Sequence, residues 1–192
     1  DIPDEDEQLA AYEQIIHAAP RHQVTIRTLD IGGDKTVPYL GHHFQEANPF
    51  MGWRSIRLSF EHPEFFMTQI RAILRAGVLA KELGGQVKMM FPMITTVEEL
   101  HRLRLNGPRA SGQLTKRGLN FTEVPLGMML EVPAAAITID VMLPYVDFVS
   151  IGSNDLVQYL MAADRDNPKV SHLCQPLSPA VLQVLRRVIR AC

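Results

Sequence analysis

Side chains that can bind an anion or a metal ion stand at the ends of short apolar segments of this sequence. They are Arg27 in segment 24–30, Glu131 after segment 126–130, and Asn154 and Asp155 after segment 148–152. In parallel α/β proteins the carboxyl ends of the strands meet at one edge, and the loops there carry ligand-binding groups. We therefore expect these side chains to contribute to a single site.

Arg27 interrupts an apolar segment near its end. A buried Arg is costly unless an anion meets it, and its planar guanidinium matches a carboxylate or a phosphate with two parallel hydrogen bonds. Arg27 therefore suggests an anion site. The alternative is a structural ion pair with Asp30 or Asp34, and the local sequence leaves both open.

Glu131 and Asp155 follow two segments that we expect to be neighbouring strands. Two carboxylates side by side are what a hard divalent cation such as Mg²⁺ needs from a protein, with water and a substrate phosphate as the other ligands. The alternative is helix capping, because Glu131 precedes Pro133 and Asp155 opens a helical segment.

Apolar segments of strand and helix character alternate along the chain, which predicts an α/β fold with a parallel sheet covered by helices, either a (β/α) barrel or a doubly wound sheet. We expect about five strands, at 24–30, 54–58, 87–93, 126–132 and 147–152, and a polar linker at 106–122. We expect helices from the acidic start to before Pro20, around 66–74, from 97 to 103, over 134–143, after a cap at Asn154 or Asp155, and from Ser178-Pro179.

Length and composition indicate one domain over residues 1–192, which is too short for a complete eight-stranded barrel. A net charge of −2 without a basic tract gives no electrostatic case for nucleic acid, and no apolar run approaches the length of a membrane span. Two distant cysteines and the lack of a signal peptide favour the cytoplasm. Because the chain does not begin with Met, we expect a piece of a longer protein.

Several longer motifs in order show that the chain resembles the C-terminal domain of enzyme I, the phosphoenolpyruvate-protein phosphotransferase of the bacterial sugar phosphotransferase system, or its nitrogen-regulatory and multidomain relatives. The motifs are Arg27-Thr28-Leu29-Asp30-Ile31-Gly32-Gly33-Asp34-Lys35, Asn48-Pro49-Phe50-Met51-Gly52-Trp53-Arg54, Phe91-Pro92-Met93-Ile94, Glu131-Val132-Pro133-Ala134-Ala135 and Ser150-Ile151-Gly152-Ser153-Asn154-Asp155-Leu156-Val157-Gln158-Tyr159. The resemblance implies an incomplete TIM-type (β/α)8 barrel, with about strands 2 to 6 of the parent domain.

The resemblance also implies residue roles. Phosphoenolpyruvate would be held by Arg27, Arg54, Asn154, Asp155 and Arg165, and Mg²⁺ by Glu131 and Asp155. In the family the phosphoryl group passes to a histidine on an N-terminal domain and then to a phosphocarrier protein, and the full-length protein is a homodimer.

No catalytic residue is expected within this chain, because the family's acid cysteine lies on a later strand. We assign that role to neither Cys174 nor Cys192, and the phosphorylated histidine to none of the seven histidines. We therefore expect the chain alone to be inactive, and its open barrel edges predict weak folding or self-association.

Two other functions remain open at this point. The barrels of pyruvate phosphate dikinase and phosphoenolpyruvate synthase share the Gly-Ser/Thr-Asn-Asp-Leu motif, although residues 30–35 and Trp53 look more like enzyme I. A dimerisation or regulatory module is the second alternative, since the barrel domain is the part of the family that dimerises.

Overall fold

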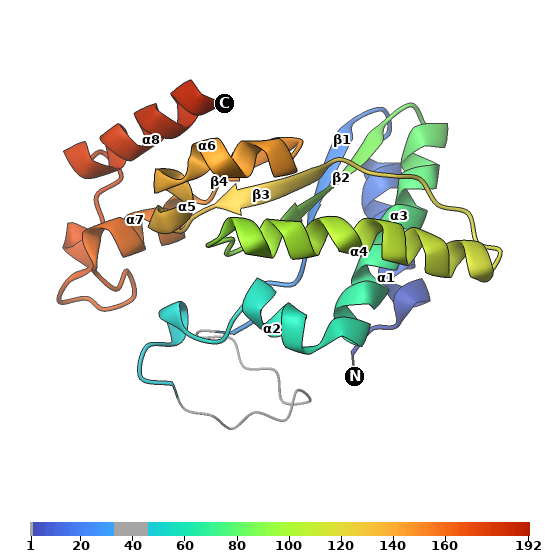
Figure 1. The fold of residues 1–192 in the computed structure, drawn as a ribbon, viewed down its shortest axis with the longest axis horizontal. Coiled ribbons are helices and arrows are strands. Elements are labelled where there is room, and N and C mark those ends of the chain that lie inside the picture. Colours follow the sequence, from blue (N-terminus) through green and yellow to red (C-terminus); the bar gives the residue numbers. More distant parts are fainter. Residues whose placement is uncertain (1, 33–45) are drawn as a thin grey trace.

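A computed structural model describes residues 2–32 and 46–192. Its centre is a sheet of parallel strands in the order β1 (Gln23–Arg27), β2 (Gln86–Phe91), β3 (Leu126–Leu130) and β4 (Phe148–Ile151). The pairs Ile26 with Met89, Phe91 with Met128 and Leu130 with Ile151 define the register. Because each strand pairs with the next one along the chain, the sheet curves as half of a barrel, which confirms the incomplete TIM-type barrel (Figure 1).

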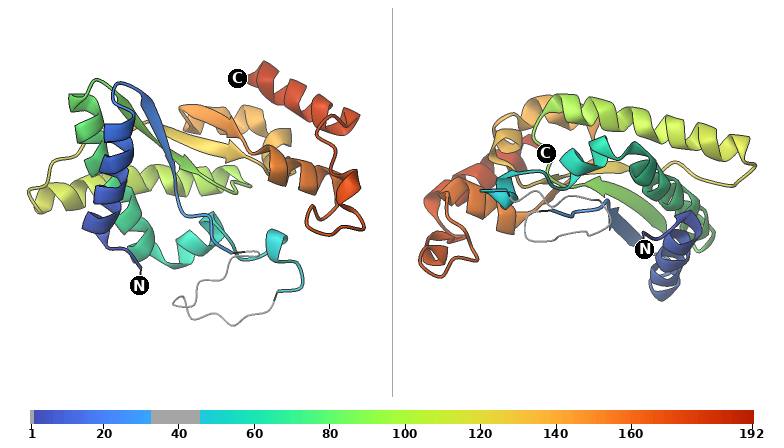
Figure 2. Two further views of the ribbon diagram at one scale, coloured as in Figure 1. Left: turned by 180° about the vertical axis from the view of Figure 1, so that it is seen from behind. Right: turned by 90° about the horizontal axis from the view of Figure 1, so that it is seen from below.

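Helices connect successive strands, and these connecting helices lie mainly on one side of the sheet, as the right-hand view of Figure 2 shows for α3, α4 and α6. The α-helices are α1 (Glu5–Ala18), α2 (Ile56–Glu61), α3 (Pro63–Glu82), α4 (Val97–Lys116), α5 (Pro133–Ile137), α6 (Ile139–Met142), α7 (Ser153–Met161) and α8 (Pro179–Ala191). In the described residues there are also the short 3-10 helices η2 (Pro49–Met51), η3 (Leu143–Tyr145) and η4 (Ser171–Leu173).

The core lies between the sheet and these helices. Phe91 and Met128 from the strands are fully buried there against Ile70 and Ile73 of α3 and Leu100 of α4. The opposite face of the sheet is less covered along β1, where Thr25 and Arg27 are exposed and alternate with the more buried Val24 and Ile26. This strand therefore keeps one face accessible at the end where Arg27 lies.

Two predictions about the elements are wrong. Segment 54–58 is not a strand, because its residues from Ile56 onward form α2, and such a short apolar run does not distinguish the two structures by periodicity. The expected linker at 106–122 is helical as far as Lys116. Leu103, Ala110 and Leu114 continue a buried helical stripe there, and this packing outweighs the unfavourable Gly107 and Pro108 within the helix.

The expected capping of α7 is also wrong, since its N-cap is Gly152 and no side chain caps it. Asp155 pairs with arginines instead. The predicted start of the last helix is confirmed, with Ser178 at the N-cap and Pro179 in the first turn of α8.

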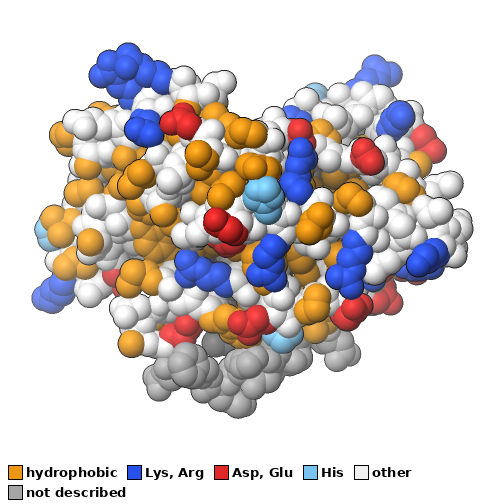
Figure 3. Space-filling view, in the orientation of Figure 1, with side chains coloured by type: hydrophobic (Ala, Val, Ile, Leu, Met, Phe, Trp, Pro, Cys, Tyr) orange, Lys and Arg blue, Asp and Glu red, His pale blue; other side chains and the backbone are white. Residues whose placement is uncertain are grey.

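The outer face over α4 carries Lys, Arg, Asp and Glu side chains interspersed with apolar ones, as Figure 3 shows. On that face no single sign of charge dominates. No helix in the described part of the chain is long and apolar enough to span a membrane.

A buried glutamate ties α1 to the neighbouring helices. Glu5 accepts hydrogen bonds of 2.7 Å from each of Arg71, Arg75 and Arg117. Burial would raise the pKa of Glu5, but these three guanidinium groups outweigh it and lower the pKa to about 2. The carboxylate is therefore charged at every ordinary pH and holds three helix segments together.

We expect Glu5→Gln to lower the free energy of unfolding by roughly 1–3 kcal/mol, because it removes the charge that the three arginines share. A lowered pKa stabilises the fold above the unfolded value near 4.5, and the contribution is lost as the pH falls toward 2. Urea unfolding at pH 7 and pH 2.5 measures both effects. Equal losses at the two pH values would contradict the assignment, and the exposed Glu82 provides a control as Glu82→Gln.

Candidate functional site

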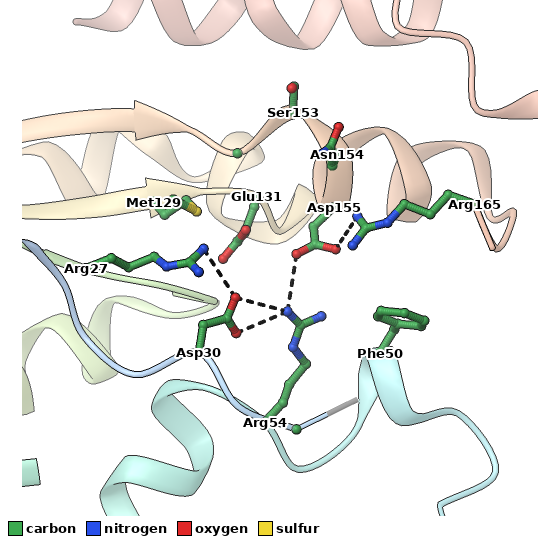
Figure 4. A pocket seen from close by; sticks show the side chains of 12 residues that line it. Arg27, Asp30, Phe50, Arg54, Met129, Glu131, Ser153, Asn154, Asp155 and Arg165 are labelled. Carbon is green, nitrogen blue, oxygen red and sulfur yellow. Dashed lines mark hydrogen bonds and ion pairs between the residues drawn. The ribbon is translucent and has the colours of Figure 1, made fainter. Parts of the chain in front are cut away.

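One cavity of about 290 Å³ opens at the carboxyl ends of the strands (Figure 4). All of the residues predicted for the site line it: Arg27, Arg54, Glu131, Asn154, Asp155 and Arg165. Asp30, Gly32, Phe50, Met129, Gly152 and Ser153 complete its wall. The structure thus brings together residues that are up to 138 positions apart in the sequence (27 to 165).

The strands explain this convergence. Arg27 ends β1, Glu131 directly follows β3, and Asp155 lies in the first turn of α7 just after β4. Because the strands are parallel and in register, their ends present these side chains to the same space. Loops supply Arg54 and Arg165, and a 2.9 Å hydrogen bond from the Arg165 backbone N–H to Gln158 fixes the second loop on α7.

Arg54 lies at the centre of the cavity and is only 5% exposed. One terminal nitrogen, Nη2, lies 3.2 Å from Asp30 and 3.3 Å from Asp155, and Nη1 donates a 3.3 Å hydrogen bond to the Tyr159 hydroxyl. Burial opposes the charge, but the two carboxylates outweigh it and raise the pKa of Arg54. The buried Nε of Arg54 has no hydrogen-bond partner among residues 2–32 and 46–192. The Arg54 side chain is therefore a cation in a fixed position, and its Nε–H can donate a hydrogen bond to a ligand.

Arg27 and Arg165 flank Arg54 at the edge of the cavity. Arg165 Nη1 lies 2.9 Å from Asp155, and Arg27 Nη1 lies 3.3 Å from Asp30. The expectation that Arg27 is buried is wrong, because its side chain is 40% exposed on the open face of the sheet. The alternative ion pair with Asp30 does form, and the other suggested partner, Asp34, lies outside the described residues. Because the Arg27 side of this pair is open to solvent, water weakens the interaction, and an incoming anion can compete for Arg27.

Glu131 is the acidic side chain with the most unusual environment. It is 2% exposed, and its Oε1 accepts a 2.6 Å hydrogen bond from the Met93 N–H, a residue whose φ of 57° lies in the left-handed region. Burial raises the pKa of Glu131 to about 7, and the negative charges of Asp155 and Asp30 add to this, while the Met93 N–H and Arg54 act in the opposite direction. A cation bound between these carboxylates would favour the charged form of Glu131 and lower its pKa again.

The side chains that could bind a metal here suit Mg²⁺ better than an ion whose ligands all come from the protein. Among residues 2–32 and 46–192, no three His, Cys, Asp or Glu side chains are grouped so that they alone would hold a metal. Glu131 and Asp155 nevertheless line the same cavity, and Mg²⁺ commonly takes only one or two carboxylates together with water and phosphate oxygens. Two carboxylates beside a cluster of arginines therefore fit this ion.

The structure adds residues that the sequence reasoning did not assign to the site. Asp30 pairs with two arginines and accepts a hydrogen bond from the Ser55 hydroxyl, and Tyr159 and Phe50 both contact Arg54. All four lie within or beside the motifs quoted above, which was the only available signal. Neither Cys174 nor Cys192 lines the cavity, nor does any histidine of the described chain.

Comparison with known proteins identifies the fold's family. A family model described as "PEP-utilising enzyme, PEP-binding domain" matches residues 1–192, where PEP is phosphoenolpyruvate. The chain belongs to this family. The resemblance stated from the motifs is therefore confirmed at the level of the phosphoenolpyruvate-binding domain.

Relatives of this phosphoenolpyruvate-binding domain are named "Phosphoenolpyruvate-protein phosphotransferase". Those of Buchnera aphidicola (strain Sg), Listeria monocytogenes and Bacillus subtilis are 45%, 47% and 46% identical to it over 189, 191 and 191 residues. These alignments cover 98–99% of the chain but 32% of each relative. The chain thus spans about a third of the length of the curated relatives it matches.

Gly152 packs directly against Glu131, one of the two candidate Mg²⁺ ligands. A methyl group at this position would lie 2.8 Å from Oε2 and 2.9 Å from Cβ of Glu131. Since the backbone φ of Gly152 is −84°, alanine fits the backbone, and the contacts that oppose it are those with Glu131 and with Cγ of Met129, 3.0 Å away. We expect Gly152→Ala to displace this carboxylate.

The expected result is Mg²⁺-dependent binding of phosphoenolpyruvate that is about tenfold weaker, with roughly 1–3 kcal/mol of lost stability, the usual cost of overpacking. Isothermal titration calorimetry measures the binding. Gly112→Ala is a control, because an added Cβ there meets nothing within 4 Å. Unchanged Mg²⁺ dependence in Gly152→Ala would contradict the placement of Glu131.

Proposed function

We propose that this chain is the phosphoenolpyruvate- and Mg²⁺-binding part of a phosphoenolpyruvate-protein phosphotransferase. The observation that carries the proposal is the convergence of three guanidinium groups on one cavity, with a buried Arg54 Nε that lacks a partner in the part of the chain that the structure describes. Phosphoenolpyruvate carries a carboxylate and a phosphate, and guanidinium groups bind both kinds of anion with directed hydrogen bonds.

The roles follow from position. Arg54, Arg27 and Arg165 would bind the carboxylate and phosphate oxygens, and Asn154, which has no side-chain partner in the described protein, would donate to the phosphate. Glu131 and Asp155 would hold Mg²⁺, which when bound neutralises phosphate charge. Arg54 already has its partners in place, so little reorganisation accompanies binding.

These residues would assist the reaction mainly by positioning the substrate and neutralising charge on its phosphoryl oxygens. The phosphoryl group would leave for a histidine on another part of the protein and then pass to a phosphocarrier protein. The pyruvate enolate left behind would receive its proton from an acid that we do not assign to this chain. Residues 1–192 would thus form one binding domain of a transferase.

The curated relatives favour this function over a dikinase or synthase, since those reported above carry the name of the phosphotransferase and are about 45% identical over the whole chain. Self-association of the domain and a cytoplasmic location stay predictions. Analytical ultracentrifugation tests the first of them directly.

Calorimetric titration of phosphoenolpyruvate into the full-length polypeptide that contains this chain tests the proposal. We expect saturable 1:1 binding that requires Mg²⁺, and much weaker binding of pyruvate, which lacks the phosphate. Absence of binding at millimolar ligand with Mg²⁺ present would refute the proposed function. The same titration with the 192-residue chain shows how much of the site it retains.

A further inference from the structure

The phenyl ring of Phe50 contacts two of the three guanidinium groups in the cavity. The ring centroid lies 5.7 Å from Cζ of Arg54 and 5.5 Å from Cζ of Arg165. Both distances are within the roughly 6 Å over which an aromatic face attracts a cation. Figure 4 shows the ring beside these two side chains at one end of the cavity.

Asp155 joins the same two arginines from another direction. Its Oδ2 lies 3.3 Å from Arg54 and its Oδ1 lies 2.9 Å from Arg165. The two guanidinium groups, which repel each other, are thus held by a carboxylate and by a ring. A second carboxylate in place of the ring would cancel the positive charge that an anionic ligand needs, whereas the ring orients the cations without neutralising them.

The backbone of Phe50 is tied to the same network. Its carbonyl accepts a hydrogen bond from the hydroxyl of Tyr159, and this hydroxyl accepts one of 3.3 Å from Arg54. Arg57 donates 3.0 Å hydrogen bonds to the carbonyls of Met51 and Gly52, which fix the end of η2. The ring therefore has a defined position relative to Arg54.

We propose that Phe50 is a positioning residue that sets the spacing of Arg54 and Arg165, and that this spacing selects ligands with two anionic groups over ligands with one. Tyr159 acts with it by holding its backbone. This inference rests on the proposed function, because it concerns how the same cavity distinguishes phosphoenolpyruvate from a simple anion.

The test compares two probes, phosphoenolpyruvate with Mg²⁺ and inorganic phosphate with Mg²⁺, by calorimetry on the full-length polypeptide. We expect Phe50→Leu, which keeps an apolar side chain but lacks the aromatic face, to weaken phosphoenolpyruvate binding about tenfold, the effect of two lost cation–π contacts. Phosphate affinity should change less than about threefold, since one anionic group does not depend on the spacing. Phe50→Tyr keeps the aromatic face and should retain the selectivity.

Phe60→Leu is the matched control. Its ring lies 3.8 Å from Cζ of Arg102, a cation–π contact that lies outside the cavity, so its loss should leave both affinities unchanged. Thermal unfolding shows whether each variant is folded.

Equal weakening of both probes in Phe50→Leu would overturn the inference, because a merely structural role affects both. If Phe50→Leu does not fold, Tyr159→Phe decides: it removes only the hydroxyl, and a loss of about threefold or more confined to phosphoenolpyruvate supports the inference, while unchanged selectivity overturns it. Wild-type protein that binds neither probe refutes the proposed function and this inference with it. If the wild type binds both probes and the ratio of the two affinities is the same in every variant, the inference alone is refuted.

Discussion

Replacing Arg54 by alanine is expected to abolish measurable phosphoenolpyruvate binding, with a loss of affinity of about 100-fold or more. Truncating one member of a buried, hydrogen-bonded charge pair commonly costs about 2–5 kcal/mol, and the ligand would then face Asp30 and Asp155 without the intervening cation. Calorimetric titration with Mg²⁺ measures the loss.

Arg54→Lys sharpens this prediction. Lysine keeps the charge but not the planar fork or the Nε donor, so we expect an intermediate loss of about tenfold. Arg109→Ala is the control, because Arg109 is exposed on α4 and lies outside the cavity. Binding that is as strong in Arg54→Ala as in the wild type would show that the cavity is not the phosphoenolpyruvate site.

Replacing Glu131 by glutamine is expected to make the protein more stable at pH 8 while removing its response to Mg²⁺. The pKa of Glu131 is raised from 4.5 to about 7 in the folded protein. The folded state therefore holds this proton more tightly than the unfolded state. Its contribution to stability is complete below pH 4.5 and is lost as the pH rises through 7.

The shift corresponds to roughly 3 kcal/mol of stability lost by pH 8 in the absence of a cation. Glutamine carries no charge, and its carbonyl can still accept the Met93 N–H, so Glu131→Gln should recover about 2–3 kcal/mol at pH 8 and little at pH 4.5. Urea unfolding of both proteins across this pH range gives the difference between their free energies of unfolding. The titration of groups that the substitution does not affect cancels in this difference.

Mg²⁺ provides the second half of this experiment. Ion binding to the folded wild type should raise its stability at pH 8, whereas Glu131→Gln should respond far less and should bind phosphoenolpyruvate at least about tenfold more weakly. The exposed Glu123 gives the control Glu123→Gln, which should behave as the wild type in both respects. A variant that loses stability at pH 8, or that keeps its Mg²⁺ response, would contradict the assignment of Glu131.

Much of the architecture, and the convergence of Arg27, Glu131 and Asp155 on one cavity, could be predicted from local patterns. The alternation of apolar strands and helices required a parallel sheet, and the polar side chains at the ends of β1, β3 and β4 then had to meet at one edge. The element boundaries were less secure. Segment 106–116 contains Gly and Pro and has a polar surface, and it is helical only because Ala110 and Leu114 find buried positions in the assembled fold.

The sequence by itself determined that Arg27, Glu131 and Asp155 stand at the ends of apolar segments, because these positions depend on residue order alone. Arg54 and Arg165 were assigned to the site by the family resemblance. Only the tertiary structure decided how those side chains are used: that Arg27 is exposed, that Arg54 is buried between two carboxylates, and that Phe50 contacts two cations. It also set the raised pKa of Glu131. Burial and electrostatic interaction depend on distances between residues far apart in the chain, and a local pattern contains no information about those distances.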